Sequence, residues 1–206
     1  YQVVRGTRRM YGVLPTGRGP SGDAPVVSLF WSVKVADHAR WREAGLAAWK
    51  AEVTSFDARI APFLEQITDA KQVLLAKYRD VRMKRWHGDR IVFLGDAAHA
   101  MSPQLGQGAN LALWDAMVLA DCLAAEPSSL VRALDAYSRL RRDHLGYYQW
   151  VTRALTPFFQ SDHDVLGWLR DVGMPIAAKF AVFRRAMVMG MCGTADGHPW
   201  RTIDGL

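Results

Sequence analysis

The amino-acid sequence predicts an α/β chain, classed as α+β when taken as a fragment, with an antiparallel sheet followed by a mainly helical second half. Three observations support this class. β-Branched and aromatic runs fill the first 35 residues. A short apolar run, Ile91–Leu94, ends in Gly95-Asp96, and helical patterns with capping residues begin near Gln107. The 206 residues are 50% hydrophobic and 22% charged, which is typical of a folded globular chain.

The predicted strands are defined by β-forming residues between turn signals. Tyr1–Val4, Met10–Leu14 and Val26–Val35 are such runs, separated by glycine- and proline-containing turns. Val73–Trp86 is predicted to be a long strand with one solvated face because it carries many charges. Ile91–Leu94 is wholly apolar, and such a run suits a parallel strand buried on both faces.

Helices are predicted where apolar residues follow a capping residue. Asp37 is the predicted N-cap of a helix that runs to about Glu52, and a second helix over 55–67 contains Pro62. Four further helices are predicted at 107–125, 129–150, 161–172 and 176–191. Ser129 is the predicted cap of the second of these, and Gly173-Met174-Pro175 is predicted to separate the last two.

The net charge of +6 and the pI near 9.6 do not indicate nucleic-acid binding. Such binding requires a basic face with base-stacking aromatics or a known reader motif, and the sequence has neither. Part of the positive charge lies in two clusters, one made of Arg79, Arg82, Lys84, Arg85 and Arg90 and one made of Arg139, Arg141 and Arg142. We interpret both clusters as solvated faces or intramolecular ion pairs.

Cysteine usage and the apolar segments indicate a cytoplasmic protein. Cys122 and Cys192 form no pattern typical of a disulfide framework or a metal site. The segment Ile176–Cys192 is interrupted by charges, so no transmembrane segment is predicted, and no signal peptide is recognised. Because the chain begins with Tyr1, inside a predicted strand, we expect it to be a fragment.

The stretch Arg90–Ala120 carries the chemical signal. Asp96 follows a predicted strand end, where open α/β folds bind ligands, and its carboxylate suits the hydroxyls of a sugar alcohol. Gly106 and Gly108 leave the amides of a helix N-terminus uncovered, which favours an electron-rich ligand atom. Glycine-rich turns and helix starts also occur without ligands, so these features alone leave both interpretations open.

The string GDAAHAMSPQLGQGANLALWDA resembles the second FAD motif of the class A FAD-dependent aromatic monooxygenases, the p-hydroxybenzoate hydroxylase-like family. The matching elements are Gly95, Asp96, Ala97, Ala98, His99, Pro103, Gly106, Gly108, Asn110, Asp115 and Ala116. The resemblance implies an FAD/NAD(P)-binding fold of that type, with FAD as cofactor. It also implies cofactor contacts at Gly95, Asp96, Pro103, Gly106, Gln107, Gly108, Ala109 and Asn110.

In the roles that the resemblance implies, Asp96 bonds the ribityl chain, Pro103 lies at the reactive face of the flavin, and the amides from Gly106 to Asn110 face its pyrimidine edge. His99 and Asp115 are interpreted as structural residues, and no catalytic residue is assigned, because the cofactor carries the oxygen chemistry. Residues of the first strands that the resemblance places near the substrate are Met10, Tyr11, Leu14 and Trp31.

The resemblance also implies a domain plan. It assigns 1–86 to the middle substrate-binding sheet domain, 87–126 to the C-terminal part of the FAD-binding domain, and 127–206 to a C-terminal helical region. The family's N-terminal unit of a strand, a Gly-x-Gly-x-x-Gly turn and a helix, which holds the pyrophosphate, is absent from the sequence, since the only string with this spacing, Gly17–Gly22, leads into the predicted strand Val26–Val35. We therefore expect a C-terminal half that binds FAD weakly or not at all alone, has no activity by itself, and associates with itself or with an N-terminal half.

The implied activity is hydroxylation of an aromatic or related conjugated small molecule with NAD(P)H and O₂. Two alternatives stay open from the sequence. One is a related FAD-fold enzyme, such as a halogenase or an isoprenoid reductase, because these share the Gly-Asp motif. The other is an inactive fragment or partner subunit that binds no FAD alone.

Overall fold

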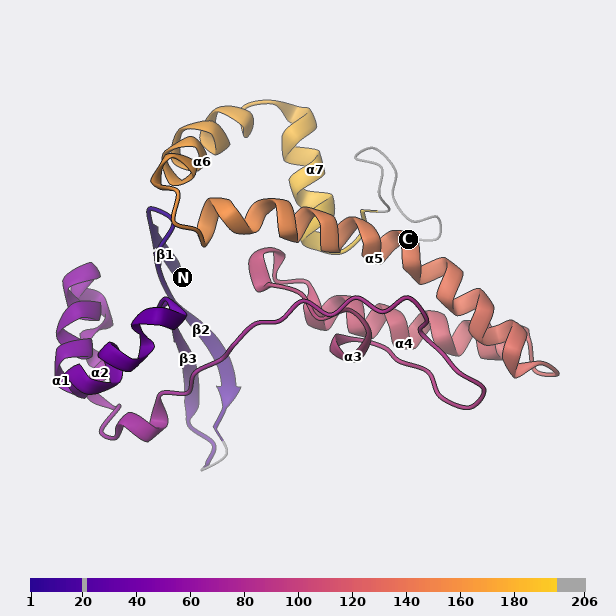
Figure 1. The fold of residues 1–206 in the computed structure, drawn as a ribbon, viewed down its shortest axis with the longest axis horizontal. Helices are drawn as coiled ribbons and strands as arrows, with labels where there is room; N and C mark the ends of the chain where they lie inside the picture. The colour runs from indigo at the N-terminus through magenta and orange to yellow at the C-terminus, as the bar shows by residue number, and fades with distance from the viewer. Residues whose placement is uncertain (20–21, 196–206) are drawn as a thin grey trace. The chain divides into compact units, whose positions relative to one another are not determined.

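A computed structural model describes residues 1–19 and 22–195. The chain divides into two units, Tyr1–Lys77 and Tyr78–Leu206, and each is described by itself. The first unit holds the sheet, and the second holds most of the helices (Figure 1).

The sheet of the first unit has three antiparallel strands in the order β1-β2-β3. They are β1 (Gln2–Arg5), β2 (Arg9–Arg18) and β3 (Pro25–Trp31). The three predicted strands are thus confirmed, although β3 ends at Trp31 rather than at Val35. Tyr11 of β2 lies opposite both Val3 and Trp31.

Helix α1 (His38–Phe56) packs its apolar face on the sheet. It follows the 3₁₀ turn η1 (Val35–Asp37), and its cluster contains Tyr11, Trp49, Val53, Phe56, Ile60 and Leu64. Asp37 does occupy the N-cap position, but its side chain makes no capping hydrogen bond and pairs with Arg40 at 3.6 Å instead. The predicted N-cap position is therefore confirmed, but the side-chain hydrogen bond expected of an N-cap aspartate is not formed.

The predicted helix over 55–67 is mostly wrong. The structure has a 3₁₀ turn η2 (Ala58–Ile60) and a short helix α2 (Ala61–Glu65), followed by the turn η3 (Ala70–Gln72). Pro62 lies in the first turn of α2 and does not divide a longer helix. Proline is tolerated there because the first amides of a helix have no acceptor within it.

The predicted strand Val73–Trp86 is wrong. Within the described residues this segment pairs with no strand, and most of its side chains are exposed. Its many charged residues suit a strand with one solvated face. A strand also needs a neighbouring strand whose backbone groups pair with its own. Single contacts hold it instead, such as the amide of Val81 donating to the carbonyl of Ala100 at 2.8 Å.

The predicted parallel strand Ile91–Leu94 is also wrong. Val92 makes one antiparallel bridge with His87, closed by a bond from the amide of Phe93 to the carbonyl of Trp86 at 2.8 Å. Ile91 is 56% exposed, so the run is not buried on both faces. An apolar run forms a buried parallel strand only when neighbouring strands flank it, and no described strand does so here.

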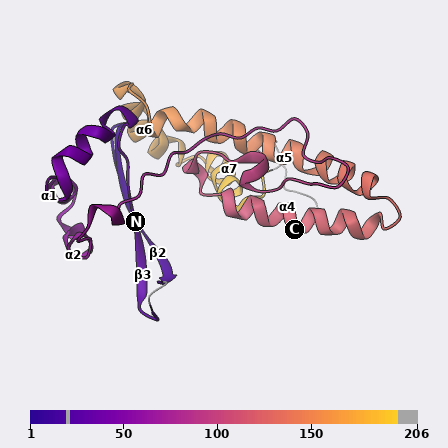
Figure 2. The same ribbon diagram turned by 60° about the horizontal axis from the view of Figure 1, so that its bottom comes forward.

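The second unit is built on two long helices that lie side by side (Figures 1 and 2). They are α4 (Gly108–Ala125) and α5 (Leu130–Phe159), and the side chain of Ser129 caps α5 as predicted. The remaining elements are α3 (Asp96–His99), η4 (Pro103–Leu105), α6 (Asp164–Ala177) and α7 (Ala181–Cys192).

Two predicted helix ends are wrong, because the helices predicted to end at 150 and 172 continue past those residues. Helix α5 continues through Pro157 to Phe159, and α6 continues through Pro175 to Ala177. Each proline lies two residues before the helix end, so its missing amide removes one bond from the last turn only. The break predicted at Gly173–Pro175 therefore falls at 178–180 instead.

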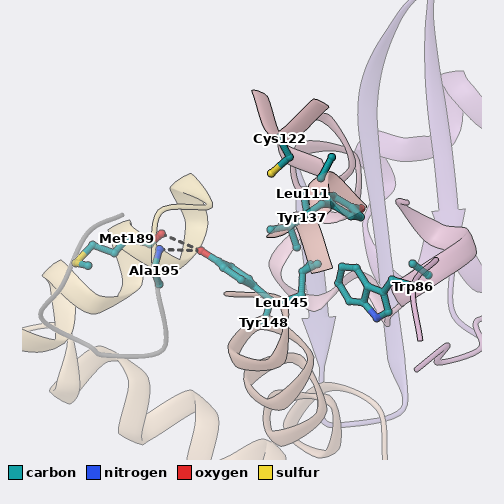
Figure 3. Packing of buried hydrophobic residues seen from close by; sticks show 10 residues of the cluster. Trp86, Leu111, Cys122, Tyr137, Leu145, Tyr148, Met189 and Ala195 are labelled. Atoms are coloured by element: carbon teal, nitrogen blue, oxygen red, sulfur yellow. Dashed lines mark hydrogen bonds between the residues drawn. The ribbon is translucent and has the colours of Figure 1, made fainter. Parts of the chain in front are cut away.

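The core of the second unit joins α4, α5 and the end of α7. Figure 3 shows Leu111, Tyr137, Leu145 and Tyr148 among its members, and Tyr148 reaches the chain at Met189 and Ala195. Within the described residues, α4 is the one helix whose length and mean hydropathy of 1.3 would suffice to cross a membrane. The core helix of a globular protein meets the same criterion, and α4 packs along α5.

Candidate functional site

Gly95 makes the sharp turn that begins the site. Its φ of 58° and ψ of −143° lie in a region that other residues rarely adopt. A side chain there would place its Cβ 3.1 Å from the Cβ of Ala112 on α4. The amide of Gly95 donates to Asp115 Oδ2 at 2.7 Å. Glycine is therefore required by both the backbone conformation and the close approach of α4.

Asp96 is the first residue of α3 and is exposed. Its carboxylate has no hydrogen-bond or ion-pair partner within 1–19 and 22–195. The oxygen Oδ1 lies 3.9 Å from the point where a Cβ would stand on Gly108. The structure thus brings together Asp96 and the start of α4, and leaves the carboxylate available to hydroxyl donors.

The start of α4 presents three amides without an acceptor in the helix. Its first intrahelical bond runs from the amide of Leu111 to the carbonyl of Gln107 at 2.9 Å, so Gly108, Ala109 and Asn110 precede it. Gly106 has a φ of 64°, and no atom lies within 4 Å of its Cβ position. Gly106 and Gly108 therefore leave space next to the partial positive charge at the N-terminus of α4.

Pro103 begins the turn η4 and is exposed. The turn closes through the amide of Gly106, which donates to the carbonyl of Pro103 at 3.0 Å. Pro103 therefore belongs to the same short loop as the two glycines.

The side chains of Gln107 and Asn110 contact the end of α7. Gln107 Nε2 donates to the carbonyl of Met191 at 2.6 Å. Asn110 Nδ2 donates to Gln107 Oε1 at 2.8 Å and to the carbonyl of Cys192 at 3.3 Å. Local sequence patterns do not indicate the contacts with α7, because the residues lie more than 80 positions apart.

A buried ionic cluster supports the site from within. Asp115 is fully buried and accepts from His99 Nε2 at 2.5 Å and from Arg141 Nε at 2.7 Å. His99 and Arg141 are themselves 1% and 2% exposed. The structural roles expected for His99 and Asp115 agree with these contacts, since Asp115 also holds the amide of Gly95.

Burial by itself raises the pKa of Asp115, but bonds from His99, from the Gly95 amide and from Arg141 outweigh burial. The pKa therefore lies below the ordinary value of an aspartate, and the cluster contributes stability only while Asp115 is ionised.

We expect acid to remove the stability that Asp115 contributes. Because the folded pKa lies below the unfolded value of about 4, this stability is complete above about pH 4 and is lost as the pH falls through the folded pKa. Urea midpoints measured downward from about pH 5 should fall more steeply for the wild type than for Asp115→Asn. Equal slopes for the two proteins would contradict this expectation.

Sequence reasoning names neither Arg141 nor His144 as part of the site. It interprets Arg139, Arg141 and Arg142 as solvated charges or intramolecular ion pairs, and Arg141 forms such a pair with Asp115, whereas Arg139 and Arg142 are exposed. Arg141 falls at helical spacing with Tyr137 and Tyr148, on the buried face of α5. That spacing could have identified Arg141 as a buried charge, and it places His144 on the same face.

The four predicted substrate residues lie in the first unit, on two faces of the sheet. Tyr11 is fully buried in the cluster against α1, and its strand partner Trp31 packs in the same cluster. Met10 and Leu14 point to the opposite face because side chains alternate along β2. Leu14 is 52% exposed and Met10 is 8% exposed. A substrate contact therefore has open surface at Leu14 and little at Tyr11.

Comparisons with known proteins bear on this site. A family model described as "FAD binding domain" matches residues 38–147, more than half of the chain. The chain is similar to 2-heptyl-3-hydroxy-4(1H)-quinolone synthase of Pseudomonas aeruginosa, with 39% identity over 123 residues, 59% of this chain and 31% of that protein. It is also similar to kynurenine 3-monooxygenase of Salinispora tropica, with 48% identity over 65 residues, 31% of this chain and 14% of that protein.

Solved structures share the fold. One of 2-methyl-3-hydroxypyridine-5-carboxylic acid oxygenase superposes with a TM-score of 0.61 and 20% identity, covering 98% of this chain and 55% of that one. At this identity the likeness shows the fold alone. The chain spans about half of that solved chain and less than a third of the two curated relatives.

Proposed function

Since this chain belongs to the FAD binding domain family, among whose members are FAD-dependent aromatic monooxygenases, we propose that it forms the flavin-side part of such an enzyme. The enzyme would hydroxylate an aromatic or related conjugated small molecule with NAD(P)H and O₂. Because the chain spans only part of its relatives, the activity and the substrate class belong to the proposal.

One observation carries the proposal: the unpartnered carboxylate of Asp96 beside the open start of α4. A carboxylate accepts hydrogen bonds from hydroxyls, which suits the ribityl chain of FAD. The amides of Gly108, Ala109 and Asn110 suit the electron-rich pyrimidine edge of the flavin. No atom lies within 4 Å of the Cβ position of Gly106, so a ring can approach the backbone there closely, and the residues present fit this cofactor.

When bound, FAD supplies the oxygen chemistry, and the residues of this chain bind and orient it. Asp96 would fix the ribityl hydroxyls, and Pro103 would border the ring. The dipole of α4 would stabilise negative charge at the ring edge. His99 Nε2 bonds Asp115 in the interior, and Asp115 in turn holds the amide of the Gly95 turn.

The remaining features of the proposal are a small aromatic substrate, a cytoplasmic location and association with itself or with an N-terminal half. Cys122 and Cys192 are both free thiols, which favours a reducing compartment. A related halogenase or isoprenoid reductase is separated from a monooxygenase by product analysis. A partner subunit that binds no FAD is separated from both by the titration below.

We expect Asp96→Ala to weaken FAD binding by about 1.5–3 kcal/mol, or about tenfold to hundredfold, because one charge-assisted hydrogen bond is lost. Binding to the 206-residue chain is expected to be weak, so amide chemical shifts are followed by NMR up to millimolar FAD. Shifts should concentrate at Gly95–Ala97 and Gly106–Asn110.

Asp121→Ala is the matched control because Asp121 is an exposed aspartate on α4, thirteen residues beyond Gly108. A control that loses as much affinity as Asp96→Ala would contradict the assignment of Asp96. Wild-type protein whose shifts concentrate outside the two segments would overturn the cofactor site.

We expect Gly108→Leu to block the flavin and leave the fold intact. The nearest atom to a Cβ at Gly108 is Asp96 Oδ1 at 3.9 Å, an ordinary contact, so the chain itself tolerates a side chain there. The leucine would then fill the space proposed for the ring. The same titration measures the loss, with Ala120→Leu on an exposed position of α4 as control. FAD binding to Gly108→Leu at wild-type affinity would contradict the proposed placement of the flavin ring.

A further inference from the structure

A path of buried hydrogen bonds connects the Gly95 turn to the end of α7. Asp115 holds the amide of Gly95 and Arg141 Nε. Arg141 Nη1 bonds His144 Nδ1, and His144 Nε2 lies 2.9 Å from the carbonyl oxygen of Gly193. Arg141 and His144 are 2% and 4% exposed, so the path runs through the interior.

The partners of His144 fix its protonation state. The guanidinium of Arg141 can only donate, so Nδ1 of His144 must accept. A carbonyl oxygen can only accept, so Nε2 must carry the proton that it donates to Gly193. His144 is therefore assigned as the neutral imidazole with its proton on Nε2, and both ring nitrogens are used.

Gly193 forms the turn that meets the start of α4. Its φ of 80° is the left-handed conformation that ends α7. The two carbonyls before it, of Met191 and Cys192, accept from the side chains of Gln107 and Asn110. The position of this turn therefore decides where those two side chains lie.

Tyr148 holds the same turn from the other side. Its hydroxyl donates to the carbonyl of Met189 at 3.3 Å and accepts from the amide of Ala195 at 3.2 Å (Figure 3). The ring of Tyr148 packs edge-on against His144 at 5.1 Å between centroids. Both supports come from α5, so α5 fixes the turn, and the turn contacts α4.

We propose that His144 is a positioning residue of the cofactor site, which holds the Met191–Gly193 turn so that the turn fixes Gln107 and Asn110 at the start of α4. This inference rests on the proposed function for its consequence in flavin binding. It adds a third segment, at the end of α7, to the two segments of the FAD motif. The effect acts through the turn, because His144 bonds the carbonyl of Gly193 and the two preceding carbonyls hold Gln107 and Asn110.

The test compares His144→Phe with His144→Gln in the 206-residue chain. Phenylalanine keeps a ring but removes both hydrogen bonds, whereas glutamine offers one acceptor and one donor in place of Nδ1 and Nε2. We expect the NMR order parameters of the Gln107 and Asn110 side-chain amides to fall below about 0.6 in His144→Phe. Wild-type values should return in His144→Gln.

Ser138→Ala is the matched control because Ser138 is buried on the same helix and bonds His87 at 2.8 Å, away from the turn. It should leave both side chains ordered. Unchanged order in a folded His144→Phe would overturn the inference, as would equal disorder in Ser138→Ala.

If His144→Phe fails to fold, the variant Gln107→Met tests the inference instead. Asn110 then loses the nearer of its two acceptors and should become more mobile, while Gly193 keeps its order because His144 still holds it. Loss of order at Gly193 would show that Gln107 holds the turn, which contradicts the proposed direction.

The consequence for flavin is measured separately. FAD affinity in the same NMR titration should fall about tenfold in His144→Phe and stay near wild type in His144→Gln. A wild-type chain that binds FAD away from Gly95–Ala97 and Gly106–Asn110 would refute the proposed function, whereas the order parameters would still decide the role of His144.

Discussion

Replacing Arg141 with leucine is expected to lower the free energy of unfolding by about 3–5 kcal/mol. The carboxylate of Asp115 is fully buried, and Arg141 Nε lies 2.7 Å from its Oδ1. Without the guanidinium, a buried charge loses one of its partners, and only His99 and the Gly95 amide compensate for it. Arg141 Nη2 also bonds the carbonyl of Leu111 at 3.3 Å, and that bond is lost as well.

Urea unfolding of the 206-residue chain measures this change, and hydrogen exchange in α4 and α5 assigns it to the second unit. Arg142→Leu is the matched control because Arg142 is exposed on the same helix, and its change should stay within about 0.5 kcal/mol.

The double variant Asp115→Leu, Arg141→Leu adds a test of the cause. It should be more stable than Arg141→Leu alone, since no unpaired buried charge remains. An Arg141→Leu variant as stable as Arg142→Leu would contradict the role given to the cluster.

Replacing Gly95 with alanine is expected to cost about 1–3 kcal/mol from backbone strain, with a further cost from crowding. The φ of 58° and ψ of −143° are unfavourable for any residue with a Cβ. That Cβ would also lie 3.1 Å from Ala112 Cβ, so either α4 or the turn must move. Movement of the turn would disturb the bond from the Gly95 amide to Asp115.

Gly146→Ala provides a control of opposite sign. Gly146 lies inside α5, is exposed, and has no atom within 4 Å of its Cβ position. Alanine there should stabilise the protein by about 0.5–1 kcal/mol because it favours the helix.

A Gly95→Ala, Ala112→Gly variant separates the two costs, because it relieves crowding and keeps the strain. The urea midpoints of these two variants and of Gly146→Ala are compared with that of the wild type. A Gly95→Ala variant that matches the wild type would show that the turn adopts another conformation without cost.

Much of the candidate site could be predicted from a short stretch of sequence. Gly95, Asp96 and the glycines at the start of α4 lie within fourteen residues, so their order along the chain already places them near one another. The strands of the first unit and the long helices of the second follow from local pattern and capping residues, such as Ser129. These features depend on neighbours in the chain, and neighbours are visible in the sequence.

The tertiary structure decided which polar groups meet in the interior and which apolar runs find partners. Val73–Trp86 and Ile91–Leu94 carry strand-like patterns, but a strand also needs an adjacent strand, and a pattern does not contain that information. His144 meets Gly193 across 49 positions, and Gln107 meets Met191 across 84. The sequence determined the FAD motif and the helices that carry it. The fold decided how α5 and the end of α7 support that motif, because hydrogen bonds between distant segments exist only once those segments are packed together.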